Sequence, residues 1–249
     1  KLPLAVDCAA GEDDAECPVE LVMTEGSLPA ASRSLTLRVY SGKNTHKRTY
    51  PSRVDGSAQY VSIVPPKDDA PHPALVLSLH GASVEATGQA GSYVSHVGAV
   101  IVCPTNRRPY GFDWEDWGRI DAIESMDLAK AWYKTDATRQ YLTGHSMGGH
   151  GTWNIGVLLA DRFAAVAPSA GWLSFDSYMG AGGPPHAPES PLGRVFQNAR
   201  ASSMTLNFFE NLRGKGIFIL HGDADDNVPV DQARTARKAL DALKIGRAH

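Results

Sequence analysis

The sequence predicts an α/β fold built on a mostly parallel, doubly wound sheet with helices on both faces. Short apolar runs that suit buried strands alternate with longer segments whose apolar residues recur at helical spacing. Strands separated by helical crossovers pair in parallel, and ligands of such sheets bind beyond the carboxyl ends of the strands. The expected strands are residues 75–79, 99–103, 140–143, 164–167 and 217–220, and the expected helices are 120–132, 149–159 and 230–244.

The sequence divides into two predicted parts. Residues 1–42 form a predicted N-terminal extension that is partly β, with possible strands at 20–23 and 34–39. Residues 43–249 form the predicted main domain, which an antiparallel pair at 45–53 and 58–64 enters. Within that domain, the segment 172–213 is longer than an ordinary connection between two strands, and it includes a Gly/Pro-rich stretch. We expect a lid-like insertion there with a weak helix near 203–211; the alternative is a surface loop without a role.

Length and composition are those of one domain of ordinary size, and the net charge limits the classes of partner that we expect. A chain of 249 residues with 43% hydrophobic content can build a core of ordinary size. Its net charge of −3, with both signs mixed, predicts no nucleic-acid partner and no membrane partner. No Cys/His cluster has the spacing of zinc ligands, so we expect no metal and no cofactor. The oligomeric state stays open.

The cysteines indicate in which cellular compartment the protein would be found. Cys8 and Cys17 flank an acidic, loop-like stretch, and either close a small disulfide loop or remain free thiols. A disulfide would fit a secreted or periplasmic protein. Cys103 ends an apolar run and is expected to be a small core residue.

The strongest chemical signal is the segment Gly-His-Ser-Met-Gly-Gly at residues 144–149, called the elbow below. It follows a predicted strand and precedes a predicted helix. A G-x-S-x-G sequence on such a tight turn presents the serine oxygen as a nucleophile, and its glycines allow helix and strand to approach closely. The elbow therefore predicts Ser146 as the attacking residue.

An upstream segment supplies the expected oxyanion donors. His80, Gly81 and Ala82, called the H-G segment below, directly follow the predicted strand 75–79. A turn of this kind aims a backbone N–H at the reacting carbonyl oxygen. We expect the N–H groups of Ala82 and Met147 to form the oxyanion hole, completing a two-donor site.

A downstream segment supplies the expected acid. His221 and Gly222 follow the predicted strand 217–220, and three aspartates come next. The spacing H-G-x-x-D-x-x-V-P selects Asp225 as the acid of a catalytic triad. Asp223 and Asp226 are then turn-forming or solvated acids.

With these motifs the chain resembles α/β-hydrolases of the prolyl oligopeptidase and esterase/depolymerase group. The resemblance runs from about residue 59 to residue 244 and includes residues 79–82, 136–149, 161–172 and 221–229. The segment 104–118 resembles bacterial proteins described as peptidases or esterases. The resemblance implies the α/β-hydrolase fold and serine-hydrolase chemistry through an acyl-enzyme, and it leaves the substrate open.

One departure from the family concerns the general base. In the family, a histidine lies on a loop beyond one further strand, whereas here the predicted helix 230–244 leaves little room before His249. We therefore expect the sheet to lack its last strand and the catalytic histidine to lie beyond His249, with His249 itself frayed. The alternative is that His249 completes the triad. The other histidines sit in turn motifs, at the variable position of the elbow, at the start of the following helix or in loops.

Aromatic and charged residues complete the expected site. Trp114, Trp117 and Trp172 are expected to line a substrate pocket, with core packing as the alternative for each. Glu115 and Asp116 are expected to pair with Arg107 or Arg108, or to be solvated.

These expectations lead to a serine esterase acting on a small-molecule or polymer-linked ester. The first alternative is a serine peptidase of the prolyl oligopeptidase type, and the second is a non-catalytic domain on a hydrolase scaffold. If the base is missing, the chain by itself has little activity.

Overall fold

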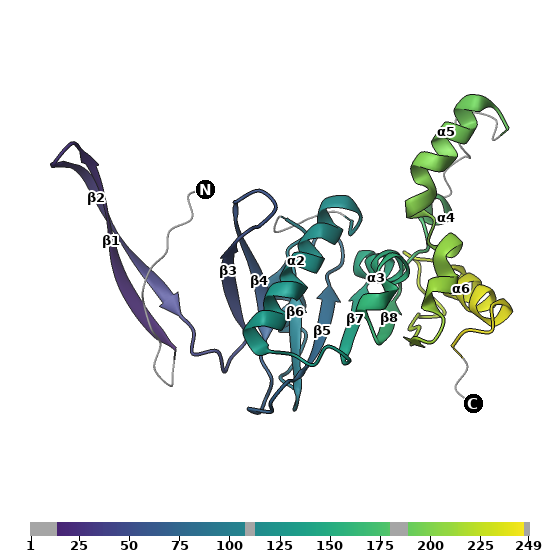
Figure 1. Ribbon diagram of the computed structural model, residues 1–249, viewed down its shortest axis with the longest axis horizontal. Coiled ribbons are helices and arrows are strands. Elements are labelled where there is room, and N and C mark those ends of the chain that lie inside the picture. The colour runs from purple at the N-terminus through teal and green to yellow at the C-terminus, as the bar shows by residue number, and fades with distance from the viewer. Residues whose placement is uncertain (1–13, 108–112, 180–188, 247–249) are drawn as a thin grey trace.

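The computed structural model describes residues 14–107, 113–179 and 189–246 (Figure 1). Its main body is a seven-stranded sheet of order β3-β4-β6-β5-β7-β8-β9. Strands β5 to β9 pair in parallel, and β3 and β4 add the antiparallel edge that the sequence predicts. The strands are β3 (His46–Pro51), β4 (Ala58–Val64), β5 (Ala74–Leu79), β6 (Ala99–Cys103), β7 (Gln140–His145), β8 (Ala165–Ser169) and β9 (Gly216–Ile217).

Helices cover both faces of this sheet. The α-helices within the described residues are α1 (Ala86–Gly91), α2 (Asp116–Tyr133), α3 (Met147–Leu158), α4 (Phe175–Met179), α5 (Pro191–Arg200) and α6 (Asp231–Ala242). The 3₁₀ segments are η1 (Ala160–Arg162), η2 (Ala201–Ser203) and η3 (Thr205–Leu212). The predicted helices 120–132, 149–159 and 230–244 correspond to α2, α3 and α6. The predicted mostly parallel sheet with helices packed on it is confirmed.

Two hydrophobic clusters show why the central strands have apolar residues at consecutive positions. Along β6, Val100 and Val102 belong to the large cluster, whereas Ile101 and Cys103 belong to a smaller one with α1. Alternate side chains point to opposite faces of a strand, so a strand covered on both faces must be apolar throughout. Cys103 is a buried free thiol, as expected.

The register of the parallel strands gathers their carboxyl ends at one edge. Leu79 of β5 pairs with Gly144 of β7, and His145 pairs with Ser169 of β8. The H-G segment, the elbow and the residues after Ser169 therefore leave the sheet side by side. This edge is where the sequence predicts the site.

The prediction of a buried strand at 217–220 is wrong about burial. β9 ends at Ile217, but the N–H groups of Phe218 and Leu220 still donate to the Val166 and Pro168 carbonyls of β8 at 3.0 and 3.2 Å. Phe218 and Leu220 are 66% and 57% exposed, while Ile217 and Ile219 pack against the large cluster. The reason is that β9 is the edge strand of the described sheet, so one of its sides and part of one face have no described neighbour.

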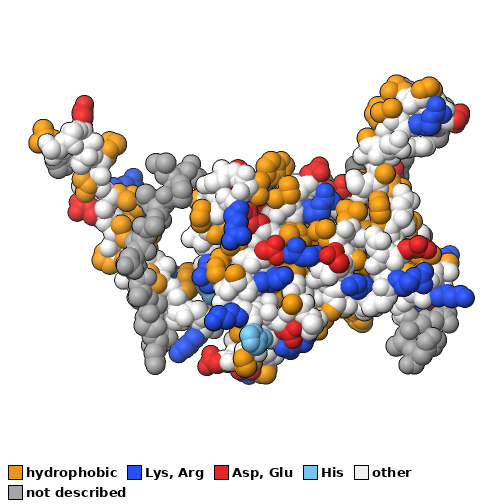
Figure 2. Space-filling view, in the orientation of Figure 1, with side chains coloured by type: hydrophobic (Ala, Val, Ile, Leu, Met, Phe, Trp, Pro, Cys, Tyr) orange, Lys and Arg blue, Asp and Glu red, His pale blue; other side chains and the backbone are white. Residues whose placement is uncertain are grey.

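Before the main domain, the predicted short strands form one long antiparallel hairpin. It consists of β1 (Ala15–Glu25) and β2 (Leu28–Val39), and it extends away from the sheet at the left of Figure 1. Apolar side chains remain exposed along it, as the space-filling view shows (Figure 2). Cys17 lies in β1 and is disulfide-bonded. Cys8, the other half of the predicted loop, lies outside the described residues.

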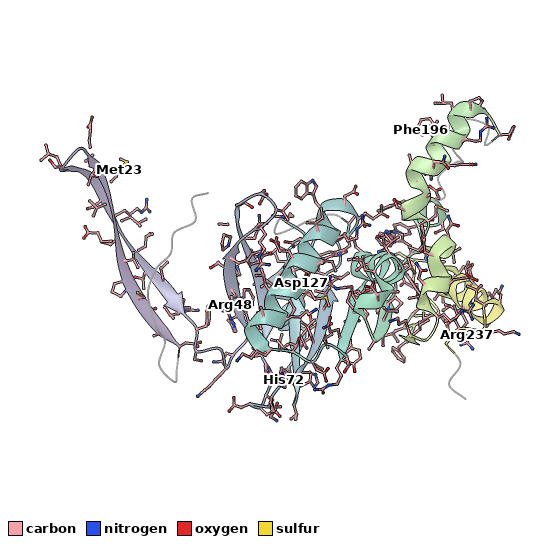
Figure 3. The ribbon with its side chains drawn as sticks, in the orientation of Figure 1. Met23, Arg48, His72, Asp127, Phe196 and Arg237 are labelled. Atoms are coloured by element: carbon pink, nitrogen blue, oxygen red, sulfur yellow. The ribbon has the colours of Figure 1, made fainter. Side chains whose placement is uncertain are left out.

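The region 172–213 contains more helix than the sequence predicts. α4, α5 and η2 were not expected, and the weak helix near 203–211 is the 3₁₀ segment η3. Ser190 caps α5 by accepting a hydrogen bond from the Gly193 N–H, and a proline at the first helical position fits the helix start. Helix α5 stands off the body, with Phe196 near its middle (Figure 3). Residues 180–188 lie outside the described part.

None of the described helices combines the length and the apolar character that a membrane span needs.

We predict that Gly149→Ala destabilises the fold by about 3 kcal/mol or more. A Cβ at Gly149 would lie 2.3 Å from the Ser169 carbonyl oxygen and 2.8 Å from Gly171 Cα, and both neighbours are backbone atoms. The matched control is Gly91→Ala in α1, where a Cβ meets no atom within 4 Å. Urea unfolding should give a much lower midpoint for the first variant and an unchanged or raised midpoint for the second. Equal midpoints would mean that the close contact relaxes at little cost.

Candidate active site

Ser146 occupies the tight turn between β7 and α3. Its backbone angles, φ 57° and ψ −117°, belong to a region that residues with a side chain rarely adopt. Two backbone hydrogen bonds hold the turn: the Ser146 N–H donates to the Ser169 carbonyl at 2.9 Å, and the Ser146 carbonyl accepts from the His150 N–H at 3.0 Å. A non-glycine residue persists in such a conformation only where its surroundings enforce it. The predicted strand-to-helix turn is thus present, with the serine half-buried at its apex.

The H-G segment lies against this turn. A Cβ built on Gly81 would be 3.4 Å from the His145 carbonyl oxygen and 3.6 Å from Ser146 Cβ. Ala82, the next residue, is exposed, and Met147 is the first residue of α3. The N–H of a first helical residue has no intrahelical acceptor. Both expected oxyanion donors therefore flank Ser146, although their role stays a prediction.

Asp225 follows β9 at the same edge of the sheet. Its Oδ1 accepts hydrogen bonds from the N–H groups of Val228 at 2.9 Å and Asn227 at 3.0 Å. The Val228 hydrogen bond is the main cause that lowers the pKa of Asp225, and nearby His221 and His145 lower it further. The carboxylate is therefore ionised at neutral pH and fixed in direction, which suits an acid that orients an imidazole.

No described histidine takes the position of the base. Ser146 Oγ makes no hydrogen bond with the described residues. His145 Nδ1 lies 3.1 Å from Ser169 Oγ, and His221 Nε2 lies 2.8 Å from the Val228 carbonyl and 3.4 Å from Asp225 Oδ2. His249 lies outside the described residues, so the expectation about its role stays untested.

The three tryptophans of the predicted pocket differ in exposure. Trp114 and Trp172 are buried in the large cluster, which is the packing alternative, whereas Trp117 is 55% exposed. The guanidinium of Arg107 lies over the Trp117 ring at 5.3 Å. Contact of any of them with a substrate stays a prediction.

Of the two expected arginine partners of Glu115, Arg108 lies outside the described residues, and Arg107 does not pair with Glu115. Arg107 pairs with Asp55 and Glu124 instead, and Glu115 lies against His150. Asp113, Glu115 and His150 bring one potential ligand atom each within 4.8 Å of one another, the one such group found among the described residues. Sequence spacing could not reveal it, because His150 comes from α3 and the two acids precede α2.

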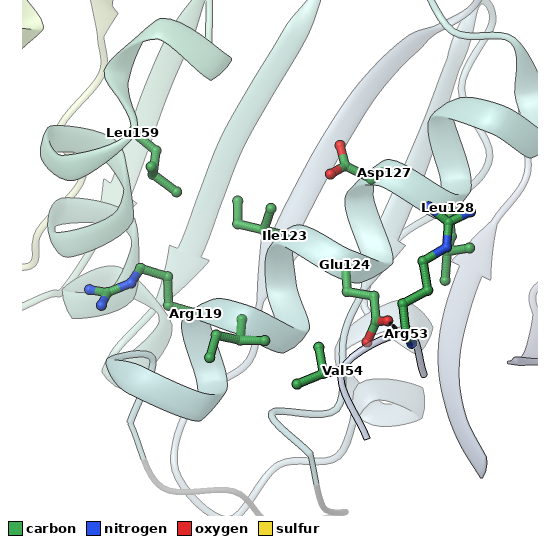
Figure 4. Close-up of a pocket in the computed structure, with 9 residues that line it drawn as sticks. Arg53, Val54, Arg119, Ile123, Glu124, Asp127, Leu128 and Leu159 are labelled. Atoms are coloured by element: carbon green, nitrogen blue, oxygen red, sulfur yellow. Dashed lines mark hydrogen bonds between the residues drawn. The ribbon is translucent and has the colours of Figure 1, made fainter. Parts of the chain in front are cut away.

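A separate hollow of about 400 Å³ lies over the outer face of α2 (Figure 4). Apolar side chains such as Ile123, Leu128 and Leu159 line it together with charged ones. None of the predicted site residues lines this hollow.

Comparison with known proteins places this site in a family. The sequence profile of the prolyl oligopeptidase family matches residues 106–248, more than half of the chain, and the match contains Ser146 and Asp225. The chain belongs to the prolyl oligopeptidase family.

Curated relatives of this family member include both esterases and peptidases. The chain is 28% identical to an uncharacterized secreted protein of Arthroderma benhamiae, over 74% of this chain and 22% of the relative. It is 31% identical to a probable dipeptidyl-aminopeptidase B of Trichophyton verrucosum, over 62% and 18%. It is also 31% identical to the bifunctional acetylxylan esterase/xylanase XynS20E of Neocallimastix patriciarum, over 48% and 19%. The chain thus spans about a fifth of the length of these relatives.

Solved structures share the fold at low sequence identity. The S-formylglutathione hydrolase FrmB of Staphylococcus aureus superposes with a TM-score of 0.60 at 15% identity, covering 81% of this chain and 87% of that one. An acylaminoacyl peptidase of Pyrococcus horikoshii superposes with a TM-score of 0.59 at 18% identity, covering 82% and 36%. These likenesses establish the α/β-hydrolase fold of this prolyl oligopeptidase family member.

We predict that Ser146→Gly is more stable than Ser146→Ala by about 1 kcal/mol. Both substitutions remove the hydroxyl, but only glycine adopts the observed φ and ψ without strain. Strain of this kind lowers the free energy of unfolding by about 1–3 kcal/mol, and glycine removes it. The greater conformational freedom of glycine in the unfolded chain cancels up to about 1 kcal/mol of that gain. Urea unfolding of the two variants measures the difference. A glycine variant that is less stable than the alanine variant would show that the turn is not strained.

Proposed function

We propose that this protein is a serine hydrolase whose nucleophile is Ser146. The observation that carries the proposal is the strained serine turn, held against the H-G segment at the carboxyl edge of a parallel sheet. A serine oxygen presented in this way can reach a carbonyl carbon whose oxygen lies between two backbone N–H groups.

In the proposed reaction Ser146 Oγ attacks the carbonyl carbon of the substrate. The N–H groups of Ala82 and Met147 stabilise the oxyanion of the tetrahedral intermediate. A histidine outside the described residues accepts the Ser146 proton and passes it to the leaving group, and Asp225 holds that imidazole in the required tautomer. Water then hydrolyses the acyl-enzyme by the same proton transfers in reverse.

Carboxylic esters are the leading substrate class in this proposal. An alkoxide leaves a tetrahedral intermediate more readily than an amine, so ester cleavage makes the smaller demand on proton transfer. The acetylxylan esterase relative supports this choice, and a small-molecule or polymer-linked ester is the expected substrate. Peptide cleavage is the second candidate, supported by the dipeptidyl-aminopeptidase relatives.

An extracytoplasmic location fits the proposed hydrolase. Cys17 is disulfide-bonded, and structural disulfides persist mainly in oxidising compartments. One relative is described as a secreted protein. We therefore propose that the protein is secreted or periplasmic.

We predict that a fluorophosphonate probe labels the natural protein at Ser146. The probe forms a tetrahedral adduct with an activated serine and mimics the proposed intermediate. Mass spectrometry of tryptic peptides locates the adduct.

The control for this labelling is Ser146→Ala, which should abolish it. Ser169→Ala is a matched second control that should keep the labelling. Ser169 lies at the same sheet edge and its Oγ is 3.1 Å from His145 Nδ1. Labelling that survives Ser146→Ala would overturn the proposed function.

We also predict that the 249-residue polypeptide hydrolyses p-nitrophenyl acetate very slowly. Among the described residues no histidine forms a hydrogen bond with Ser146 Oγ, and loss of the base in a well-studied serine hydrolase lowers turnover by about 10⁶. The oxyanion donors remain, so hydrolysis somewhat above the rate in water is expected. A spectrophotometric assay measures it, with Ser146→Ala as the background.

High activity of this polypeptide would show that one of its own histidines acts as the base. His249→Ala is then the first variant to assay, because His249 lies outside the described residues.

A further inference from the structure

Three side chains that can bind a metal ion converge beside the elbow. Asp113 and Glu115 precede α2, and His150 lies in the first turn of α3. One potential ligand atom from each, a carboxylate oxygen or a ring nitrogen, lies within 4.8 Å of the other two. His150 Nε2 is 3.2 Å from Glu115 Oε1 and 3.5 Å from Asp113 Oδ1. These three side chains are called the His-Asp-Glu cluster below.

The separations in the cluster match the spacing of ligands around one small divalent cation. Zinc binds imidazole nitrogens and carboxylate oxygens at about 2.0–2.2 Å, so two ligands at the tetrahedral angle are about 3.3–3.6 Å apart. The two nitrogen–oxygen distances, 3.2 and 3.5 Å, agree with that spacing. Hydrogen bonds have similar lengths, so the choice between an ion and hydrogen bonds depends on what surrounds the cluster.

Outer contacts orient each of the three side chains. His150 Nδ1 lies 3.0 Å from the Trp172 carbonyl oxygen, which fixes the ring and directs Nε2 toward the acids. Ser203 Oγ donates to the second oxygen of Glu115, and Asp113 Oδ1 accepts from the N–H of the next residue at 2.6 Å. Histidines that bind metals usually donate their other ring N–H to a carbonyl or carboxylate, and ligating carboxylates are themselves hydrogen-bonded. The cluster therefore has the outer contacts of a metal site.

The cluster is shielded from solvent but has an entrance. The side chain of His150 is fully buried, and those of Asp113 and Glu115 are 14% and 18% exposed. A second hollow of about 400 Å³ is lined by both acids together with polar residues such as Asn106 and Asp116. An ion can reach the acids through this hollow, and water in it can complete the coordination shell.

The charges around the cluster favour a cation. Asp113 and Glu115 bring two carboxyl groups together at low exposure, where like charges repel each other. Two bases lie nearby, but among the described residues neither forms an ion pair with the cluster. Arg107 pairs with acids outside the cluster, and Arg119 donates to the Asn154 side chain. A divalent cation between the two carboxylates would replace their repulsion by attraction.

We propose that Asp113, Glu115 and His150 form a binding site for one divalent transition-metal ion, with zinc as the best match. The ion binds one imidazole nitrogen and two carboxylate oxygens, and a water molecule from the hollow completes a four-coordinate shell. A mixed nitrogen and oxygen set suits zinc better than calcium or magnesium, which prefer oxygen ligands. Sequence spacing predicts no such site, because His150 is far along the chain from the two acids.

The ion in this proposal is a structural link between segments. It joins residues 113–115 to α3, next to two contacts that already hold this segment: the Asp113 N–H points at the Met147 sulfur, and Trp114 Nε1 donates to the His80 carbonyl at 3.0 Å. Structural zinc adds its binding free energy to the stability of the fold. The proposal needs no reaction at the elbow and is independent of the proposed function.

Zinc titration of the purified protein tests the site directly. The protein is dialysed against EDTA and then against metal-free buffer near neutral pH, and zinc chloride is added in a calorimeter. We expect one ion to bind with a dissociation constant of about 1 μM or lower. His150→Gln, Asp113→Asn and Glu115→Gln should each weaken this binding at least about tenfold, because even changes in the outer contacts of metal sites have effects of that size.

The matched control for the titration is His221→Gln. His221 Nε2 also lies near a carboxylate oxygen, Asp225 Oδ2 at 3.4 Å, but this is its one carboxylate contact among the described residues. The control should bind zinc like the wild type. Melting temperatures measured in EDTA verify that each variant folds, and the two amide substitutions preserve the shape of the acids. Zinc at about 100 times its dissociation constant should raise the melting temperature of the wild type by about 5–10 °C.

Cobalt(II) reports the coordination geometry of the bound ion. Four-coordinate cobalt(II) absorbs visible light much more strongly than six-coordinate cobalt(II). The wild type with cobalt(II) should show strong bands that zinc abolishes by displacement, and His150→Gln should lack them. Weak bands in the wild type would contradict the four-coordinate site.

Two results would overturn the metal site. The first is a wild type that binds no zinc at a stoichiometric concentration, and the second is equal binding by the wild type and the three cluster variants. Hydrogen bonds alone would then hold the cluster together. Tighter binding of calcium than of zinc would reject the assigned class of ion. None of these results bears on the nucleophile, which fluorophosphonate labelling of Ser146 tests separately.

Discussion

Close contact between backbones at the start of α3 is the constraint on which the proposed site depends. A Cβ on Gly148 would lie 2.0 Å from the Leu79 carbonyl oxygen, and one on Gly149 would lie 2.3 Å from the Ser169 carbonyl oxygen. Helix α3 therefore touches the ends of β5 and β8 directly, without side chains between them. This contact leaves Ser146 no room for an ordinary conformation, so the serine takes the strained one. The same backbone contact therefore packs the core and sets the geometry of the nucleophile.

The loops around α3 add polar contacts to this apolar packing. Trp114 fills the space that Gly151 leaves, since a Cβ there would be 2.5 Å from Trp114 Cβ, and its indole N–H satisfies the His80 carbonyl. His150 joins the loop after β8 to the acids that precede α2. Polar groups buried so deeply need hydrogen-bond partners, because leaving one unsatisfied costs about 1–3 kcal/mol. Paired as they are, they fix the mutual placement of segments that sequence separates widely.

The sheet and its flanks are unequally covered. At β3 and β4 the antiparallel edge packs into the large cluster through Tyr50 and Val61. At the other edge Phe218 and Leu220, which follow β9, are exposed, and the hairpin of β1 and β2 exposes apolar side chains such as Met23 and Leu28. Exposed apolar surface of this kind is typical of regions that contact other protein segments, and strand edges of this kind pair readily. These flanks lie outside the residues that form the proposed site.

The sequence by itself determined the order of the central strands and helices along the chain, the elbow at Ser146 and the loops that carry Ala82 and Asp225. These features are local, because strand alternation, helical periodicity and turn glycines leave their pattern within a few consecutive residues. The tertiary structure alone decided what depends on contacts between distant segments. It buried Trp114 and Trp172, placed β9 at an edge of the sheet and set Glu115 against His150, while Arg107 pairs with other acids. Side-chain pairing across loops follows from the register and packing of the whole sheet, which no short stretch of sequence encodes.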